Sequence, residues 1–217
     1  ILFLVHKNIM NLSKKILSWY DNNKRTLPWR ISKNSKKKHY YRILSEFMLQ
    51  QTQVKTVIPY FKNFVHKVPS LKALSESNEK KILKLWEGLG YYSRAKNLHK
   101  TSKILVKKYD SQIPDSFEKL KELPGIGDYT ANILLALIYN RPRIGIDGNV
   151  KRVLLRLFNL ETKDPSNLFK TKRNGDLAEA LMEFGAIICK PKDPLCHKCK
   201  LKKNCSYYKS ESKIRFN

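Results

Sequence analysis

Acidic side chains are scarce in this 217-residue sequence, in which 18 Asp and Glu stand against 44 Lys and Arg and give a formal net charge of +26. An excess of one sign on this scale favours a polyanionic partner, and nucleic acid is the first candidate. A genome rich in lysine and asparagine codons would account for part of the excess. The remainder still requires a partner of negative charge.

Long apolar runs are also missing, since no stretch approaches the roughly 20 apolar residues that span a membrane. The opening residues 1–5 are too short for the core of a signal peptide and have no basic stretch before them. Because Ile1 is not an initiator and Met10 precedes a convincing helical pattern, we expect residues 1–9 to be an upstream extension or a cloning remnant. We expect a cytoplasmic, nucleoid-associated protein if the source is bacterial, with a nucleus or an organelle left open.

Alternation of apolar and polar residues, the pattern of a β-strand, is not sustained anywhere between turn signals. Helical periodicity runs instead through nearly the whole chain, with prolines at several boundaries, and there are no internal repeats. We therefore predict an all-α protein. After a first amphipathic segment around residues 16–20, its helical segments are expected at about 40–51, 54–67, 71–75, 79–87, 91–109, 116–122, 128–140, 148–158, 166–171 and 176–188.

Cysteine occurs only at Cys189, Cys196, Cys199 and Cys205, with the spacing C-x6-C-x2-C-x5-C. Two disulfides would need a secretory context, and these cysteines are too close together for useful loop closure. A four-cysteine zinc site usually has two C-x2-C pairs, whereas this stretch has one. A 4Fe–4S cluster accepts one close pair with two flanking ligands, so the spacing favours a cluster. The stretch resembles the iron–sulfur loop of the endonuclease III superfamily of DNA glycosylases.

The cysteine stretch is also rich in lysine. These side chains either solvate a surface loop or form, with the cluster, a rigid basic finger that contacts DNA phosphates without reading the base sequence. The two interpretations are compatible. The residues concerned are Lys190, Lys192, Lys198, Lys200, Lys202 and Lys203.

A glycine-containing hairpin, LPGIGDYTA at residues 123–131, joins two helical segments. Gly125 and Gly127 permit positive φ and let backbone N–H groups approach a ligand closely. The helix that follows points its free N–H groups the same way. A plain tight turn is the alternative. The string resembles the helix–hairpin–helix of the same superfamily, so we expect both glycines to contact the DNA backbone.

Two carboxylates are candidates for chemistry. Glu46 lies among apolar residues of a helix, and Gln50 and Gln53 are expected to share its side as a polar stripe. Apolar neighbours would raise the pKa of Glu46 by desolvation, which suits a general acid; a surface glutamate is the alternative. Asp147 opens a helix, where spacing alone favours an ordinary N-cap.

Four further strings resemble the MutY family of adenine DNA glycosylases. They are LPWR (27–30), SEFMLQQTQV (45–54), GLGYY (88–92) and DGNVKRV (147–153), and the similarity covers about residues 10–205. The resemblance implies a six-helix-barrel domain at residues 34–143 that includes the helix–hairpin–helix at about 116–140. It also implies a helical iron–sulfur cluster domain formed by the N- and C-terminal segments, 1–33 and 144–217, with the cluster loop at 189–205.

The same resemblance implies a monomeric base-excision-repair enzyme. Its partner would be double-stranded DNA with adenine opposite 8-oxoguanine or guanine, and it would flip the adenine out and hydrolyse its N-glycosidic bond. By this carry-over Glu46 protonates N7 of adenine, Asp147 stabilises an oxocarbenium-like sugar, and Asn149 and Tyr129 hydrogen-bond around the centre. The adenine pocket would contain Arg25, Leu27, Trp29, Arg30 and Glu183, the opposite base would meet Gln51, Thr52, Leu89 and Tyr91, and the four cysteines would bind one 4Fe–4S cluster.

Lysine is missing from residues 122–140. Bifunctional members of the superfamily carry a lysine in the hairpin, whose amine attacks the sugar and permits strand cleavage through a Schiff base. In this chain Tyr129 takes that place. The sequence therefore predicts a monofunctional hydrolase without an efficient lyase step.

The chain departs from the family pattern in two places. Residues 31–38 (ISKNSKKK) form a lysine-rich insertion, expected to be a solvated loop. The chain also ends 12 residues after Cys205, where the family usually has a second domain that helps to distinguish 8-oxoguanine from guanine. We expect either a minimal enzyme or a fragment, with base removal intact and weaker discrimination of the opposite base.

Two other functions stay open at this point. The first is a thymine glycosylase that acts on G·T mismatches, because those relatives also have tyrosine at the place of Tyr129. The second is a non-catalytic iron–sulfur module that only binds DNA. The combination of LPWR, QQTQ and DGNV argues against the first, and the presence of Glu46 and Asp147 argues against the second.

Overall fold

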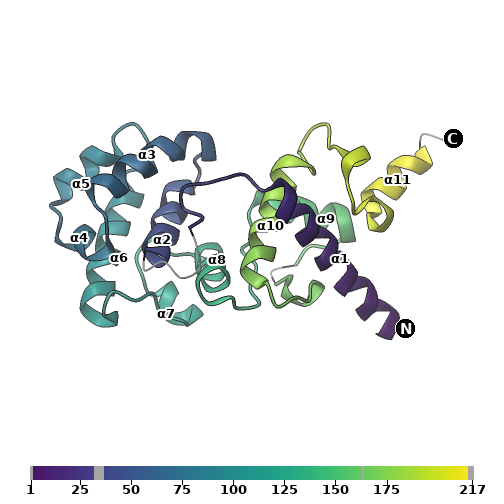
Figure 1. Ribbon diagram of the computed structural model, residues 1–217, viewed down its shortest axis with the longest axis horizontal. Helices are drawn as coiled ribbons and strands as arrows, with labels where there is room; N and C mark the ends of the chain where they lie inside the picture. Colours follow the sequence, from purple (N-terminus) through teal and green to yellow (C-terminus); the bar gives the residue numbers. More distant parts are fainter. Residues whose placement is uncertain (1, 32–36, 163, 215–217) are drawn as a thin grey trace. The chain divides into compact units, whose positions relative to one another are not determined.

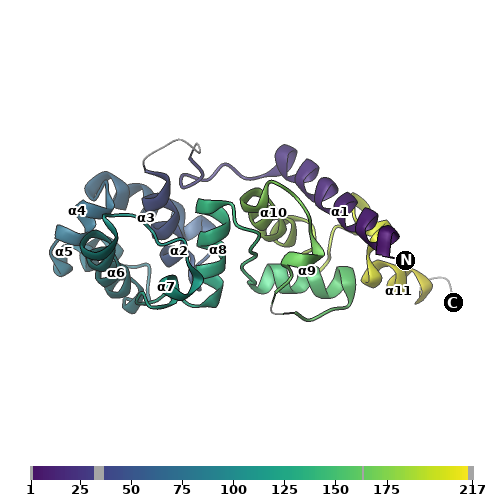
Figure 2. The same cartoon turned by 90° about the horizontal axis from the view of Figure 1, so that it is seen from below.

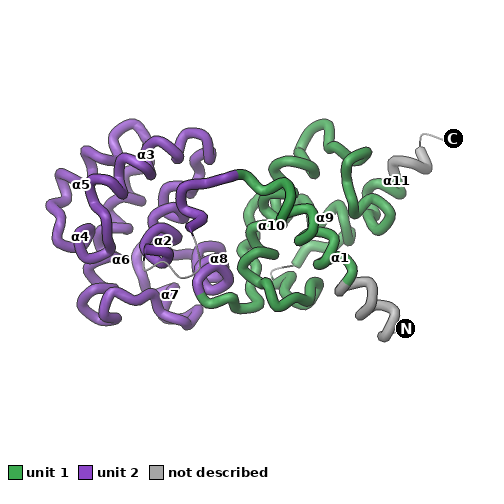
Figure 3. The backbone as a smooth tube through the Cα atoms, viewed as in Figure 1, with its two compact units in different colours: residues 1–25, 139–217 green, residues 26–138 purple. Residues whose placement is uncertain are grey.

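The computed structural model describes the backbone of residues 2–31, 37–162 and 164–214, with side chains for 11–31, 37–162 and 164–210 (Figures 1 and 2). Within these ranges every regular element is helical, which confirms the all-α prediction. Among the helices described, none has the length and apolar character needed to cross a bilayer. The chain forms two compact units (Figure 3): residues 1–25 and 139–217 make up unit 1, and residues 26–138 make up unit 2.

Unit 2 is a set of helices around a core of large side chains. Helix α6 packs beside α4 and α5, and α2 packs on α3 and α6 (Figure 1). Phe47, Phe61, Phe64, Trp86 and Leu98 are fully buried between them. The helices are α2 (Lys38–Leu49), α3 (Val54–Lys67), α4 (Leu71–Glu76), α5 (Glu79–Trp86), α6 (Ser93–Tyr109), α7 (Phe117–Lys121) and α8 (Asp128–Tyr139), close to the predicted segments.

Polar N-caps explain where three short helices of unit 2 begin. The side chains of Ser70, Asn78 and Ser116 precede α4, α5 and α7, and each accepts a hydrogen bond from a backbone N–H of the first turn. Such a bond satisfies one of the donors that a helix leaves without an internal partner. These caps are local signals, and the helices they start lie close to the segments that the sequence periodicity predicted.

Unit 1 is built around α10 (Asn174–Ile187), which packs on α1 (Leu2–Asn23) and α9 (Gly148–Phe158) (Figures 1 and 2). Trp19 meets Phe184 edge-on, with ring centroids 5.0 Å apart. The Tyr20 hydroxyl donates a buried hydrogen bond of 2.6 Å to Glu179. A fourth helix, α11 (Ser206–Ile214), packs on α9. The N-terminal helix thus completes a core made mostly by the last third of the chain.

Three details of unit 1 differ from the predictions. Helix α1 begins at Leu2, before the expected start near Met10. The predicted helix at 166–171 is wrong: only Ser166–Leu168 form a 3-10 turn, because the Asp164 carboxylate accepts hydrogen bonds from the backbone N–H and hydroxyl of Ser166 and so competes with helix formation. Helix α11 was not predicted.

A tertiary contact accounts for the helix that the sequence pattern missed. The Arg156 guanidinium of α9 lies over the Tyr207 ring of α11, 4.8 Å from its centroid. Packing of this kind stabilises short helices whose own periodicity is weak. Of the predicted basic loop at 31–38, residues 32–36 lie outside the described part of the chain, and α2 already begins at Lys38. The assignment of the barrel and cluster domains to the predicted ranges stays a prediction.

Candidate functional site

Glu46 lies in the last turn of α2 and is buried, with 6% of its surface exposed. The predicted polar stripe beside it is wrong, because α2 ends at Leu49. Gln51 then takes a left-handed backbone conformation with φ of 56°, and Gln53 is the N-cap of the next helix. Gln50 caps the end of α2 instead of lining its face. Glu46 is therefore a buried carboxylate of α2, and Gln50 and Gln53 do not continue a polar stripe along that helix.

The glycine hairpin is fixed to the same helix. Gly125 has a φ of 81°, and a Cβ there would lie 2.8 Å from a ring carbon of Phe47 and 2.9 Å from Cβ of Asn97. The Gln50 amide donates a 3.1 Å hydrogen bond to the Gly125 carbonyl. Gly127, in contrast, has open space where a side chain would be. The first glycine is thus required by close packing, and the second leaves the backbone accessible.

Tyr129 lies in the first turn of α8, directly after the hairpin, and is half-buried. Glu46, the hairpin and Tyr129 all belong to unit 2. Unit 2 therefore contains the buried carboxylate of Glu46. It also contains the phenol of Tyr129, at the position where bifunctional members of the superfamily carry a lysine.

Two exposed turns in unit 2 carry the residues predicted to meet the opposite base. We call them the wedge segments, residues 49–52 and 88–91. Gln51 and Tyr91 are the non-glycine residues of the two segments that have a positive φ, at 56° and 47°, and Tyr91 is 59% exposed. Thr52 is half-buried and Leu89 is buried, so they support the turns from inside. Arg94, which the sequence analysis missed, hydrogen-bonds to backbone carbonyls of both segments.

Asp147 in unit 1 is the N-cap of α9, as its position predicted. One carboxylate oxygen accepts a 2.7 Å hydrogen bond from the backbone N–H of Val150. The other accepts a 3.0 Å hydrogen bond from the Asn149 side-chain amide. The two bonds fix the carboxylate at the positive end of the helix, where negative charge is favoured. Asp147 is half-buried.

Arg152, a second residue that the sequence analysis missed, connects this cap to the cysteine region. Its guanidinium donates 2.8 Å hydrogen bonds to Oδ1 of Asn149, to the carbonyl of Gly185 and to the carbonyl of Cys189. A Cβ on Gly185 would lie 2.7 Å from that of Asn149, so α9 and α10 need this glycine to approach. The orientation of Asp147 is thereby coupled, through Asn149 and Arg152, to the first residue of the cysteine stretch.

The residues predicted for an adenine pocket fall in both units. In unit 1, Arg25 and Glu183 form an ion pair of 2.6 Å, and Nε of Arg25 adds bonds of 3.1 and 3.0 Å to the same carboxylate. Glu183 is 2% exposed, so the pair holds a buried negative charge in place. In unit 2, Leu27 and Trp29 are buried, and Arg30 is half-buried. The Trp29 ring packs edge-on against Phe61.

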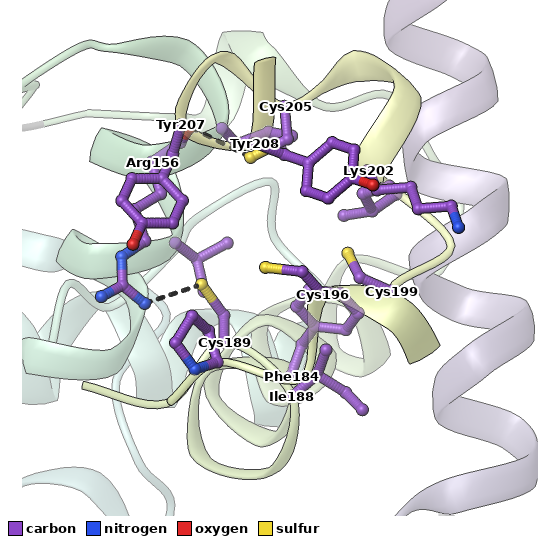
Figure 4. Close-up of a pocket in the computed structure, with 14 residues that line it drawn as sticks. Arg156, Phe184, Ile188, Cys189, Cys196, Cys199, Lys202, Cys205, Tyr207 and Tyr208 are labelled. Carbon is purple, nitrogen blue, oxygen red and sulfur yellow. Dashed lines mark hydrogen bonds between the residues drawn. The ribbon is translucent and has the colours of Figure 1, made fainter. Parts of the chain in front are cut away.

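The four cysteine side chains line one pocket of unit 1 (Figure 4). All four are free thiols and half-buried. Apolar side chains of α9 and α10 form much of the wall, and burial raises the pKa of Cys199 to about 11 and that of Cys205 in the same direction. Arg156 donates a 3.6 Å hydrogen bond to Sγ of Cys189. Binding of a metal centre would have to displace the thiol protons.

The four thiols are candidate ligands of one metal centre, because all of them line the same pocket. Among the described residues, no group of three or more Cys, His, Asp or Glu side chains is arranged to hold a single metal ion. In a 4Fe–4S cluster each thiolate binds a different iron.

The lysines of the cysteine stretch lie at the surface, with Lys202 half-buried and the other five exposed. This agrees with the solvated-loop interpretation. Their exposure also leaves them accessible to phosphate groups, so contact with DNA stays a prediction.

Comparison with known proteins places these observations in a family context. Residues 44–175 match the model of the HhH-GPD superfamily of base excision DNA repair proteins. The adenine DNA glycosylase of Buchnera aphidicola subsp. Baizongia pistaciae is 40% identical over 213 residues, which are 93% of this chain and 60% of that protein. The chain spans about three fifths of the length of the three Buchnera relatives that it matches.

Solved structures show the same fold. A thermostable thymine-DNA glycosylase has a TM-score of 0.81 and 26% identity, with 92% of this chain and 95% of that chain covered. An endonuclease III in a non-covalent complex with DNA has a TM-score of 0.74 and 19% identity, over 94% of this chain and 96% of that chain. The all-α fold with a helix–hairpin–helix that the resemblance implied is therefore confirmed.

The packing of the hairpin predicts different effects for its two glycines. Gly125→Ala combines a left-handed backbone with a contact that α2 and α6 cannot relieve, so it should lower the free energy of unfolding by about 1–3 kcal/mol. Gly127→Ala is the matched control, since its Cβ meets nothing, and should change that free energy by less than about 0.5 kcal/mol. Urea unfolding followed by circular dichroism measures both. Equal losses in the two variants would contradict this description of the hairpin.

Proposed function

The chain belongs to the HhH-GPD superfamily of base excision DNA repair proteins, and from this we propose that it hydrolyses the N-glycosidic bond of adenine mispaired with 8-oxoguanine or guanine. The observation that carries the proposal is a buried Glu46 on α2, in a chain 40% identical to a protein named adenine DNA glycosylase. We assign the barrel to unit 2 and the cluster domain to unit 1.

In this proposal Glu46 works as a general acid and then as a base. Its proton goes to N7 of the flipped adenine while the bond between N9 of the base and C1′ of the sugar breaks. The carboxylate left on Glu46 takes a proton from the water that adds to C1′, which restores the acid. The burial of Glu46 supports this role, because it keeps the carboxyl group away from bulk water.

Asp147 is proposed to stabilise the positive charge that develops on the sugar. Hydrogen bonds from Val150 and Asn149 hold its carboxylate in one orientation, so little reorganisation is needed when the charge appears. Retaining glycosidases meet the same demand with a second carboxylate. Arg152 acts on this group only through Asn149, so it is a positioning residue.

The flipped adenine is proposed to bind among the residues of the predicted pocket. Of the residues that the resemblance implies, Arg25 and Glu183 of unit 1 form a fixed polar pair, and Leu27 and Trp29 of unit 2 are buried apolar side chains. The wedge segments, with Gln51 and Tyr91 at their exposed points, would fill the gap that the adenine leaves in the stack. Gly125 and Gly127 would bring backbone N–H groups to the phosphates.

A 4Fe–4S cluster is proposed for the pocket formed by the four cysteines, where it would bind their thiolates and give a rigid support to the basic stretch around them. The lysines of this stretch would then contact DNA phosphates with little entropic cost. Supporting this are the four thiols that line one pocket and the hydrogen bond from Arg156 to Cys189.

A thymine glycosylase for G·T mismatches is the second candidate. The observation in its favour is the TM-score of 0.81 with a thymine-DNA glycosylase, although the identity to that protein is 26%. The adenine assignment is preferred because the identity to the adenine-named relative is 40% over 93% of this chain.

Removal of the proposed acid tests the chemistry. Glu46→Gln keeps the size of the side chain but removes its proton, so the single-turnover rate on adenine opposite 8-oxoguanine should fall by about 10²–10⁴-fold. Glu179→Gln is the matched control, because this buried carboxylate accepts a hydrogen bond from Tyr20 in the core of unit 1 and has no role in the proposed chemistry, so its rate should stay near wild type. Activity of Glu46→Gln equal to that of the control would contradict the assignment.

The hairpin predicts how the reaction ends. Wild-type protein should release adenine and leave the strand intact, because Tyr129 has no amine to form a Schiff base. Tyr129→Lys should gain strand cleavage and should become covalently trapped on DNA by borohydride. Trapping of the wild-type protein would show that another amine performs a lyase step, and the monofunctional assignment would fail.

The cluster assignment is tested by metal analysis of the protein purified without oxygen. We expect about four irons and four acid-labile sulfides per chain, and their loss in Cys199→Ser. Lys203→Gln changes an exposed neighbour and should keep the full iron content. About one zinc per chain in place of iron would overturn the assignment.

A further inference from the structure

Arg94 is a buried cation that binds backbone carbonyl groups of two separate turns. It lies in the first turn of α6 and is 6% exposed. Nη1 donates to the carbonyls of Phe47 and Met48, at 3.2 and 2.7 Å, and to that of Gln50. Nη2 donates to the carbonyls of Leu89 and Gly90, at 3.2 and 3.0 Å. One guanidinium therefore joins both wedge segments.

The first group of carbonyls belongs to the C-terminal end of α2. The last four carbonyls of a helix have no partner inside it, and this end of the helix dipole favours a cation. Arg94 supplies both the donors and the charge there. Since Glu46 lies one turn earlier and Gln51 follows directly, the contact fixes the end of the helix that carries the acid and the first wedge segment.

The second group of carbonyls belongs to the turn after α5. The Arg94 guanidinium lies 5.5 Å from the centroid of the Trp86 ring and 5.4 Å from that of the Tyr91 ring. Trp86 is fully buried, and its indole N–H donates a 3.1 Å hydrogen bond to the Gly90 carbonyl. The exposed Tyr91 ring thus packs against the guanidinium of Arg94, which in turn packs against the buried Trp86 ring.

The backbone of both wedge segments requires such support. Gln51 and Tyr91 have side chains with a Cβ, yet both adopt the left-handed region, with φ of 56° and 47°. Non-glycine residues persist in that region only where the surrounding structure determines their conformation. Arg94 is bonded to the residue before Gln51 and to the residue before Tyr91.

We propose that Arg94 is a positioning residue that holds the two wedge segments at a fixed separation, so that Gln51 and Tyr91 enter the base stack together. This rests on the proposed function, which places those two side chains beside the opposite base. Arg94 itself would not touch DNA. The planar guanidinium is needed because it directs donors to two sets of carbonyls at once, which the single ammonium group of a lysine does not.

The first experiment reports on insertion without catalysis. The whole 217-residue chain, purified without oxygen and with a Glu46→Gln substitution, is mixed with a duplex that carries adenine opposite 8-oxoguanine and 2-aminopurine next to the adenine. Unstacking on binding raises the 2-aminopurine fluorescence. Adding Arg94→Lys or Arg94→Met should reduce this rise by about tenfold, since small misplacements are costly. The affinity for undamaged duplex, which depends on backbone contacts, should change by less than about threefold.

Leu98→Ala is the control for a general loss of stability. Leu98 is fully buried in the same helix as Arg94. Its apolar side chain cannot donate hydrogen bonds to the carbonyls of the wedge segments. At a comparable fall in Tm it should keep the fluorescence rise. An undiminished rise in Arg94→Lys, or an equal loss in Leu98→Ala, would overturn the proposal.

The second experiment separates insertion from chemistry in protein that keeps Glu46. Arg94→Lys should slow single-turnover adenine removal by about tenfold or more from the paired duplex. It should slow removal far less when the adenine faces an abasic site, because that base is already poorly stacked. Equal slowing on both duplexes would overturn the positioning role. If wild-type protein removed adenine from neither duplex, the proposed function would fail, whereas the fluorescence result would still decide the role of Arg94.

Discussion

The C-terminal end of α2 has carbonyl oxygens that the helix itself cannot satisfy, and the arrangement of unit 2 follows from how they are satisfied. Arg94 donates to the carbonyls of Phe47, Met48 and Gln50, and the Gln50 amide reaches the Gly125 carbonyl in turn. The buried acid, the first wedge segment and the hairpin are consequently held within one rigid frame. Loss of this end of the helix would disturb all three at once, although none of them is a large part of the core.

Unit 1 uses the same principle at the opposite end of a helix. The N–H groups at the start of α9 need acceptors, and Asp147 provides one while its other oxygen binds Asn149. Arg152 then connects Asn149 to the Cys189 carbonyl, and Gly185 allows the close approach of α10. The Asp147 carboxylate that caps α9 is also the group proposed to face the sugar. Helix stability and the proposed function therefore both require a carboxylate at residue 147.

The sequence predicted most helices because their signals are local. Periodicity and N-caps such as Ser70 and Asn78 act over a few residues, and the cysteine spacing needs no tertiary knowledge. The misses have tertiary or competing causes. Helix α11 depends on packing against α9, the segment after Asp164 is diverted by side-chain hydrogen bonds, and the stripe beyond Glu46 ends where Gln51 reverses the chain. Arg94 and Arg152 lie inside or beside predicted motifs, but nothing in those motifs shows which carbonyls a guanidinium will reach.

We propose that the protein removes adenine, rather than removing thymine or only binding DNA. The most direct measurement is a comparison of single-turnover rates on three duplexes of one sequence: adenine opposite 8-oxoguanine, adenine opposite guanine, and thymine opposite guanine. We predict release of adenine from both of the first two and none of thymine from the third. Release of thymine without adenine would contradict the assignment, and no release from any of the three would leave a binding module.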